Sequence, residues 1–173
     1  ALIYLAECFI LFLIGKFAYK LFQQKIKVGK ELVENDNFAF ATAPVGYFIG
    51  LLLAITSAVI GPSYGLWDDM LNIGIYGLLA ILLLNISIII NDKLILRKFS
   101  VYKEIIEDRN VGTGVIEGAN AIATGLIILG SVSGEGGGVL TALIFWLVGQ
   151  LLLLLTSLFY NLVTPFDVHD QIE

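Results

Sequence analysis

The sequence predicts an all-α protein, a polytopic bundle of transmembrane helices, and two observations carry this prediction. The chain has 173 residues, of which 58% are hydrophobic and only 14% are charged, and its mean hydropathy is +0.90. A soluble domain of this size carries roughly a quarter charged residues. The apolar residues also gather in runs of about 20 or more, the length that a helix needs to cross some 30 Å of hydrocarbon.

Five apolar runs are long enough to be spans. The first holds Glu7 and Cys8 near its start and lacks the basic leader and small-residue cleavage site of a signal peptide, so we interpret it as a span. The third has Trp67 at its interfacial end, with Asp68 and Asp69 available as helix caps. The expected spans are residues 1–22, 37–60, 71–90, 110–130 and 138–163.

The basic residues predict the orientation of the chain. All ten Lys and Arg residues lie within residues 16–30 or 93–109, near the two connections that five spans place on one side of the membrane. The other connections, residues 61–69 and 131–138, contain no base. The positive-inside rule makes the basic side cytoplasmic, so we expect the N-terminus outside and Glu173 inside.

The two basic connections contain related segments. Residues 28–37 read VGKELVENDN and residues 101–110 read VYKEIIEDRN, so Val, Lys, both Glu and the final Asn match. Val28, Leu32 and Val33 are spaced as one face of a helix. We therefore expect each segment to form a short amphipathic helix in the membrane interface.

A span, an interfacial helix and a second span thus form one repeat unit. Both full copies run in the same direction, which implies parallel internal repeats about an axis along the membrane normal. The expected units are residues 1–65 and 66–137, with a third, incomplete copy starting at residues 138–173. The tail, residues 168–173, reads VHDQIE and resembles the start of a third connecting segment, so we expect the chain to be part of something longer.

An Asn stands where each basic connection enters a membrane helix. Asn37 and Asn110 follow Glu34 and Glu107 by three residues. An Asn at this position caps the helix by accepting a hydrogen bond from a backbone N–H that would lack a partner near lipid. We prefer this structural role; the functional alternative is that these helix N-termini hold an anion or a lipid headgroup.

These segments resemble a known family. ENDNFAFA and EDRNVGTGVIEGANAIATGL combine an acidic-polar-Asn step, small residues and a glycine-punctuated span, and they are similar to the YjfL-like bacterial inner-membrane proteins, a domain family of unknown function. In the longer form with repeated domains, the second copy carries a glutamate a few residues into the span, which Glu117 matches. The resemblance implies a multi-span protein of the bacterial inner membrane and implies no activity.

Small residues in the second and fourth spans predict faces where helices pack closely. Glycine and alanine let membrane helices approach each other where no hydrophobic effect drives association. Because the two spans are related by a duplication, we expect them to pack on each other or across an oligomer. The residues of these packing faces are Gly46, Gly50, Gly114, Gly118, Ala121 and Gly125.

Glu117 is the main candidate for a functional residue. It lies roughly 10 Å inside the cytoplasmic end of its span at 1.5 Å per residue, and a carboxylate at that depth should face protein or water. The duplication pairs it with Pro44, which frees a backbone carbonyl, and we predict one polar cavity around both. The candidate proton or cation site is Glu117 with Asn120 and Pro44. The structural alternative is a hydrogen bond from Glu117 to Asn120, Asn85 or Gln150.

Other residues that carry chemistry are scarce. Cys8 is the one cysteine and His169 the one histidine, and no spacing pairs a nucleophile with a base, so we expect no enzyme, no metal site and no cofactor. We expect a non-enzymatic membrane component among membrane lipids, without nucleic acid, that self-associates as a homo-oligomer or binds partners in a larger complex. The alternative is a small channel or transporter in which Glu117 carries a proton or cation.

Overall fold

The computed structural model describes residues 1–22, 26–95, 100–133 and 138–165, and these residues contain helices and no strand. Five helices are long and apolar enough to cross a membrane, so the predicted all-α fold with five spans is confirmed and the chain is a multi-pass membrane protein. They are α1 (Leu2–Phe22), α2 (Phe38–Val59), α3 (Leu66–Leu94), α4 (Val111–Val132) and α5 (Val139–Val163).

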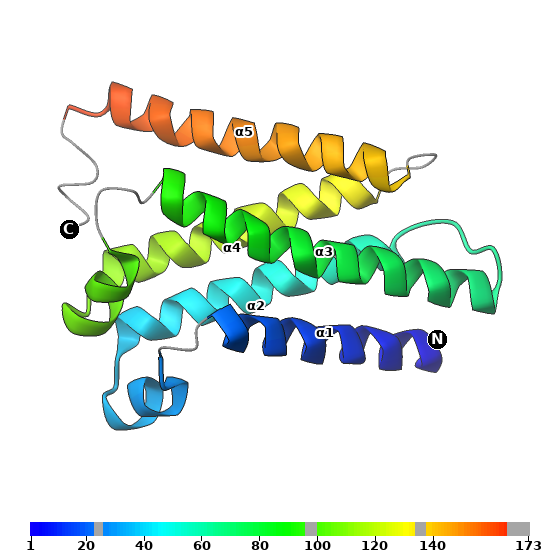
Figure 1. The fold of residues 1–173 in the computed structure, drawn as a ribbon, viewed down its shortest axis with the longest axis horizontal. Helices are drawn as coiled ribbons and strands as arrows, with labels where there is room; N and C mark the ends of the chain where they lie inside the picture. The colour runs from blue at the N-terminus through cyan, green and yellow to red at the C-terminus, as the bar shows by residue number, and fades with distance from the viewer. Residues whose placement is uncertain (23–25, 96–99, 134–137, 166–173) are drawn as a thin grey trace.

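The helices form one bundle, with α1 and α5 on opposite sides of the other three (Figure 1). Two short turns of π-helix, η1 (Lys30–Glu34) and η2 (Lys103–Glu107), lie at the end where α2 and α4 begin. We call this end the basic end. The opposite end, formed by residues 60–65 and the starts of α1 and α5, is the base-free end.

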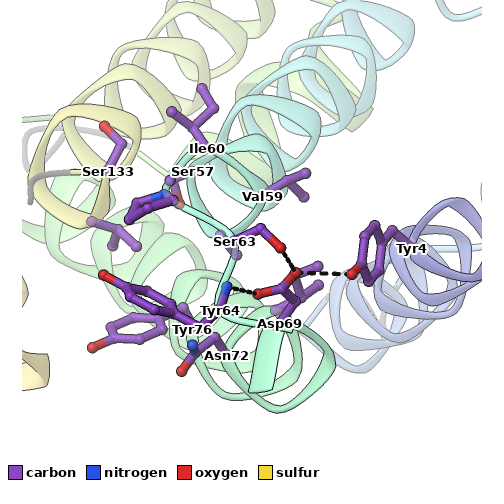
Figure 2. Close-up of a pocket in the computed structure, with 15 residues that line it drawn as sticks. Tyr4, Ser57, Val59, Ile60, Ser63, Tyr64, Asp69, Asn72, Tyr76 and Ser133 are labelled. Carbon is purple, nitrogen blue, oxygen red and sulfur yellow. Dashed lines mark hydrogen bonds between the residues drawn. The ribbon is translucent and has the colours of Figure 1, made fainter. Parts of the chain in front are cut away.

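The observed bounds agree with the predicted spans within two residues except for the third. We predicted residues 71–90, whereas α3 covers 29 residues, roughly 43 Å at 1.5 Å per residue. That exceeds the ~30 Å hydrocarbon thickness, so the polar residues at both ends of α3 can extend beyond the hydrocarbon. The prediction that Asp68 and Asp69 are caps was wrong: the helix starts after Gly65, whose φ of +127° favours glycine, and both Asp lie in the first turn. Asp69 instead accepts the backbone N–H of Tyr64 at 2.9 Å (Figure 2).

The interfacial segments differ in form from the prediction. Each is a single π turn preceded by two helical residues, not a continuous amphipathic α-helix. In the first copy Leu32 and Val33 are exposed and Val28 packs against a small apolar cluster, whereas in the second copy Ile105 is buried in that cluster. The two copies therefore use their apolar residues differently: η2 buries Ile105, whereas η1 itself leaves Leu32 and Val33 exposed.

The centre of the bundle is the pair α2 and α4, which run in parallel and touch through their small residues. A Cβ placed on Gly46 would overlap the backbone of Gly118, and one on Gly125 would lie 2.5 Å from the carbonyl oxygen of Gly50. Gly114 meets Ala39 and Gly50 meets Ala121 equally closely. The predicted packing faces thus lie against each other inside one chain.

The remaining helices pack around this pair. On the α1 side, the Tyr47 hydroxyl donates to the carbonyl oxygen of Gly15 at 3.0 Å. On the α5 side, the indole N–H of Trp146 donates to the Ser87 hydroxyl at 2.9 Å. α1 and α5 keep most of their apolar side chains exposed, as helices that face lipid do. The division into repeats at residues 1–65, 66–137 and 138–173 stays a prediction, and the tail at 168–173 lies outside the described residues.

Candidate functional site

The two helices of the central pair begin with the same cap. Asn37 accepts the backbone N–H of Phe40 at 3.0 Å, and Asn110 accepts that of Thr113 at 3.3 Å. Both Asn residues therefore sit at the N-cap positions at which the sequence predicted them. The chain enters each cap through a left-handed residue, with φ of 46° at residue 36 and 53° at residue 109.

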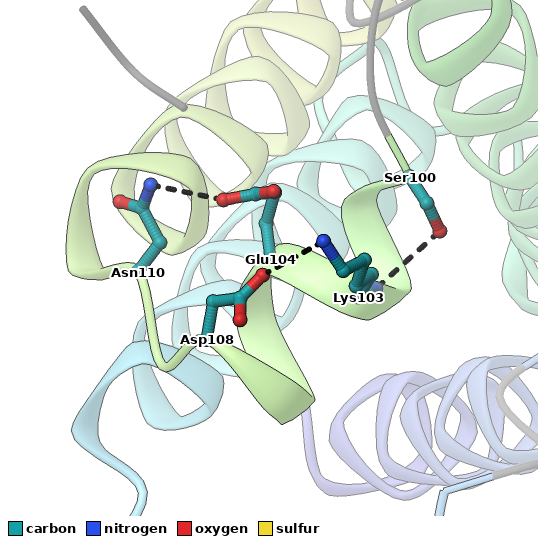
Figure 3. Close-up of polar contacts among 5 residues, drawn as sticks. All are labelled: Ser100, Lys103, Glu104, Asp108 and Asn110. Carbon is teal, nitrogen blue, oxygen red and sulfur yellow. Dashed lines mark hydrogen bonds and ion pairs between the residues drawn. The ribbon is translucent and has the colours of Figure 1, made fainter.

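A buried glutamate accepts hydrogen bonds from the Asn residue of each cap. The Asn37 amide donates to the Glu31 carboxylate at 3.2 Å and its backbone N–H to the Glu31 carbonyl at 2.9 Å. Asn110 makes the same two bonds to Glu104, at 3.2 Å and 2.8 Å (Figure 3). Glu31 and Glu104 are buried, and their negative charge already stands near the positive end of a helix dipole. This favours the structural interpretation of both caps over an anion or lipid phosphate site.

The glutamates predicted to belong to this motif lie elsewhere. Glu34 and Glu107 are exposed on the outside of η1 and η2. The partners are the glutamates six residues before each Asn, which also match between the two copies. The matched spacing was the signal that could have identified them. Sequence alone could not rank the two pairs, because a π turn changes which residue faces the cap.

The first cap also contacts the second connecting segment. The Asn37 amide donates a further hydrogen bond to the backbone carbonyl of Ile105, at 2.9 Å, which joins the first cap to η2. Ile105 packs with Phe40 and Ala43 of α2. η2 is therefore held against the start of α2 by a buried hydrogen bond and by apolar packing.

Beneath η2 lies a cavity of about 190 Å³, which we call the carboxylate cavity. This volume is large enough to hold water. Five elements contribute to its wall: α1, α3 and α4 supply Tyr19, Asp92 and Glu117, α2 supplies Phe40, and η2 with its flanks covers the cavity. Its lining residues are Tyr19, Phe22, Ile26, Phe40, Asp92, Val101, Tyr102, Ile105, Ile106 and Glu117.

The polar groups of this cavity lack protein partners. Glu117 is 9% exposed, and within the described residues neither Glu117 nor Asp92 has a hydrogen bond or an ion pair. The hydroxyl of Tyr19 is buried and also without a partner in that part of the chain. Buried polar groups in proteins nearly always have a partner, whether protein, water or ion. Three unpartnered oxygen-bearing side chains around one cavity therefore indicate that the cavity holds water, a proton or a cation.

The other residues predicted around Glu117 are elsewhere. Pro44 is buried in α2 and Asn120 has a buried, unpartnered amide nitrogen, but neither lines the carboxylate cavity. Asn85 bonds to the hydroxyl of Tyr47, and no hydrogen bond joins Glu117 to Asn120, Asn85 or Gln150 in the described chain. The predicted structural alternative for Glu117, a packing hydrogen bond to one of these amides, is therefore not the arrangement observed.

Sequence reasoning missed Asp92 and Tyr19. Asp92 fell two residues beyond the predicted third span and so counted as part of a basic connection, whereas α3 continues through it. Tyr19 gave no signal, because an aromatic residue near the end of a span is ordinary in membrane proteins. Only the packing of α1, α3 and α4 brings the two to Glu117.

Polar residues continue from the cavity toward the middle of the bundle. The amide of Asn91, the neighbour of Asp92, lies 3.4 Å from the hydroxyl of Thr124, two turns along α4 from Glu117. Farther toward the base-free end, Leu84 on α3 and Ile128 on α4 are completely buried in the apolar core. These two apolar side chains lie between the Asn91–Thr124 contact and the base-free end.

The chemistry of the site follows from its ligands. Within the described residues no group of three or more His, Cys, Asp and Glu side chains could hold a metal ion. Two carboxyl groups and a phenol can take up and release protons or neutralise one small cation.

A family model described as Domain of Unknown Function (DUF350) matches residues 1–132. The match covers α1 to α4 and so includes Tyr19, Asp92, Glu117 and both Asn caps. Neither the comparison with curated proteins nor the comparison with solved structures gives a match.

Proposed function

Because the chain belongs to the DUF350 family, a domain of unknown function, we propose an activity from its own residues: it binds and moves a proton or a small monovalent cation at Glu117 and Asp92. In this proposal it is a non-enzymatic protein of the bacterial inner membrane. The basic end, with η1 and η2, faces the cytoplasm, as the distribution of Lys and Arg predicts.

The observation that carries the proposal is the pairing of two carboxyl groups from different helices in one cavity. A carboxylate in a membrane helix is expensive, and such residues commonly belong to proton relays or ion pathways. Two of them in one low-dielectric cavity also repel each other when both are charged. A proton or cation between Glu117 and Asp92 relieves that repulsion, and among the described residues no Lys, Arg or His lines the cavity to do so instead.

The segments that cover the cavity support gated transport, in which the proton or cation reaches the cavity only when they move. η2 lies over the cytoplasmic side, and π-helical turns often mark functional sites. The buried side chains of Leu84 and Ile128 lie between the Asn91–Thr124 contact and the base-free end. Passage across the membrane therefore requires a change of conformation, as in a transporter.

The experiment compares charge-neutralising variants in liposomes that contain either a pH-sensitive dye or a dye sensitive to Na⁺ or K⁺. Glu117→Gln and Asp92→Asn should each reduce the initial rate of proton or Na⁺/K⁺ flux under an imposed potential at least tenfold, about 1.4 kcal/mol in barrier height. Glu107→Gln, on the exposed side of η2, is the matched control and should transport normally. Wild-type flux from correctly folded Glu117→Gln protein would refute the proposal.

The second candidate is the self-association or partner binding that the sequence predicted. The glycine faces do not supply its interface, because α2 and α4 cover each other's. The outer face of α5 is the better candidate, since Leu151, Leu155 and Phe159 are 55%, 50% and 65% exposed. Lipid alone also covers such a face, so the oligomeric state has to be measured; Leu151→Cys crosslinking in native membranes does this.

A further inference from the structure

The base-free end of the bundle contains a larger cavity, of about 590 Å³, which we call the tyrosine pocket (Figure 2). It is formed by the connection between α2 and α3, the first turns of α1 and α3, and the last turns of α2 and α4. Its volume falls in the usual range of small-molecule sites, about 300–1,000 Å³. Its polar lining residues are Tyr4, Ser57, Ser63, Tyr64, Asp69, Asn72, Tyr76 and Ser133.

One carboxylate is fixed in the wall of this pocket. Asp69 accepts hydrogen bonds from the Tyr4 hydroxyl at 2.8 Å, the Ser63 hydroxyl at 2.5 Å and the Tyr64 backbone N–H at 2.9 Å. These bonds join α1, the connection and α3 at one point (Figure 2). All three donors are neutral, so they orient the carboxylate without neutralising its charge.

None of the described Lys and Arg residues lines this pocket. In the sequence, all ten Lys and Arg residues fall within residues 16–30 and 93–109, outside the segments that form it. Glu7, one turn along α1 from Tyr4, does not line the pocket, and one of its carboxyl oxygens is buried without a partner among the described residues. The pocket therefore has a negative electrostatic potential that favours a cation.

The lining selects an organic cation over a metal ion. A hard metal ion needs about six or more oxygen ligands at close range, and the pocket offers one carboxylate whose neighbours are hydrogen-bond donors. Tyr4, Tyr64 and Tyr76 instead contribute three aromatic rings to the lining. A carboxylate combined with several aromatic rings is the composition that binds alkylammonium groups.

We propose that the tyrosine pocket binds an organic ammonium cation through Asp69 and the rings of Tyr4, Tyr64 and Tyr76. The ammonium belongs either to a lipid headgroup, such as ethanolamine, or to a free amine. This site is separate from the carboxylate cavity at the basic end. A failure of the proposed transport activity would therefore not refute ammonium binding at this site, and the reverse also holds.

The test measures binding to the full chain in nanodiscs made only of phosphatidylglycerol, which has no amine. Ethylammonium and tetramethylammonium are titrated by calorimetry, and Asp69→Asn should weaken binding at least about tenfold, as expected for loss of a charged partner. Asp68→Asn is the matched control, because Asp68 is exposed beside Asp69, and it should change the affinity less than twofold.

A second variant separates binding from folding. Asp69→Asn loosens three hydrogen bonds, whereas Tyr76 makes no hydrogen bond within the described residues, so Tyr76→Leu removes a ring without disturbing that network. Tyr76→Leu should also weaken ammonium binding, with an unchanged melting temperature. Equal affinity of wild type, Tyr76→Leu and Asp69→Asn, or no binding to the wild type, would overturn the proposal.

The lipid arm identifies the source of the ammonium group. In nanodiscs that contain phosphatidylethanolamine, native mass spectrometry should show retained phosphatidylethanolamine on the wild type and its loss from Asp69→Asn if the ligand is a headgroup. Retention that also blocks ethylammonium binding assigns the pocket to lipid. Ethylammonium binding that phosphatidylethanolamine does not reduce assigns it to a free amine.

Discussion

Replacing Gly46 with alanine tests the contact between α2 and α4 at its closest point. The new Cβ would meet the Gly118 backbone, which cannot rotate away as a side chain can. To restore an ordinary carbon contact of ~3.5–4.0 Å, the two helices must separate locally by about 1 Å or more. Overpacking of this kind costs up to about 3 kcal/mol.

The net effect is smaller because alanine is the better helix former. The gain over glycine inside a helix is up to about 1 kcal/mol, which leaves a loss of about 2 kcal/mol. Gly130→Ala is the matched control. Gly130 lies in α4, the helix that packs on α2, but a Cβ there meets open space. This variant should gain roughly 0.5–1 kcal/mol instead.

The assay is thermal unfolding of purified protein in detergent, followed by circular dichroism. At about 2–4 °C per kcal/mol for a chain of this size, Gly46→Ala should melt roughly 4–8 °C lower than the wild type and Gly130→Ala a few degrees higher. Equal shifts of the same sign for both variants would refute the close contact between α2 and α4.

Further predictions concern the caps, the cavity and the outer face. Glu31→Ala should lower stability by about 1–3 kcal/mol in thermal unfolding because it leaves the Asn37 amide without its carboxylate partner, whereas exposed Glu34→Ala should have almost no effect. Tyr19→Phe removes a buried, unpartnered hydroxyl, so the melting temperature should not fall; a lowered flux in liposomes would then assign that hydroxyl to transport. Leu151→Cys should form disulfide-linked dimers in native membranes if α5 is an interface, and it should stay monomeric if α5 faces lipid.

The spans and the caps could be predicted because they depend on local sequence. Hydropathy located the five helices, and an Asn before an apolar run located both caps. Small residues at four-residue spacing predicted the faces of α2 and α4, since close approach of membrane helices needs residues without bulk.

The composition of the carboxylate cavity could not be predicted, because it depends on which helices are neighbours. Glu117 was recognisable from its depth in an apolar run, but its companions come from α1 and α3. Pro44, its equivalent by sequence offset, lies on α2 and does not line the cavity. Two residues related by the offset occupy equivalent positions in the two copies. Equivalent positions are in contact only where they lie close to the axis that relates the copies.

The same offset shows how the two copies differ at the residues of the cavity. The matched Asn residues are 73 positions apart (110 − 37). By that offset Asp92 corresponds to Tyr19, and Glu117 corresponds to Pro44. The second copy thus supplies two carboxyl groups where the first supplies a phenol and a ring without any polar atom in its side chain.

The two copies also differ in the short π-helical segment that corresponds to the one covering the cavity. Ile105 is buried in η2 above the cavity, whereas its counterpart by the same offset, Leu32, is exposed on η1. The Asn37 amide holds η2 in place through the Ile105 carbonyl. Similar caps and small-residue faces in both copies account for the stability of the pair. The residues that differ between the copies account for the carboxylate cavity, so a functional variant should be sought among them first.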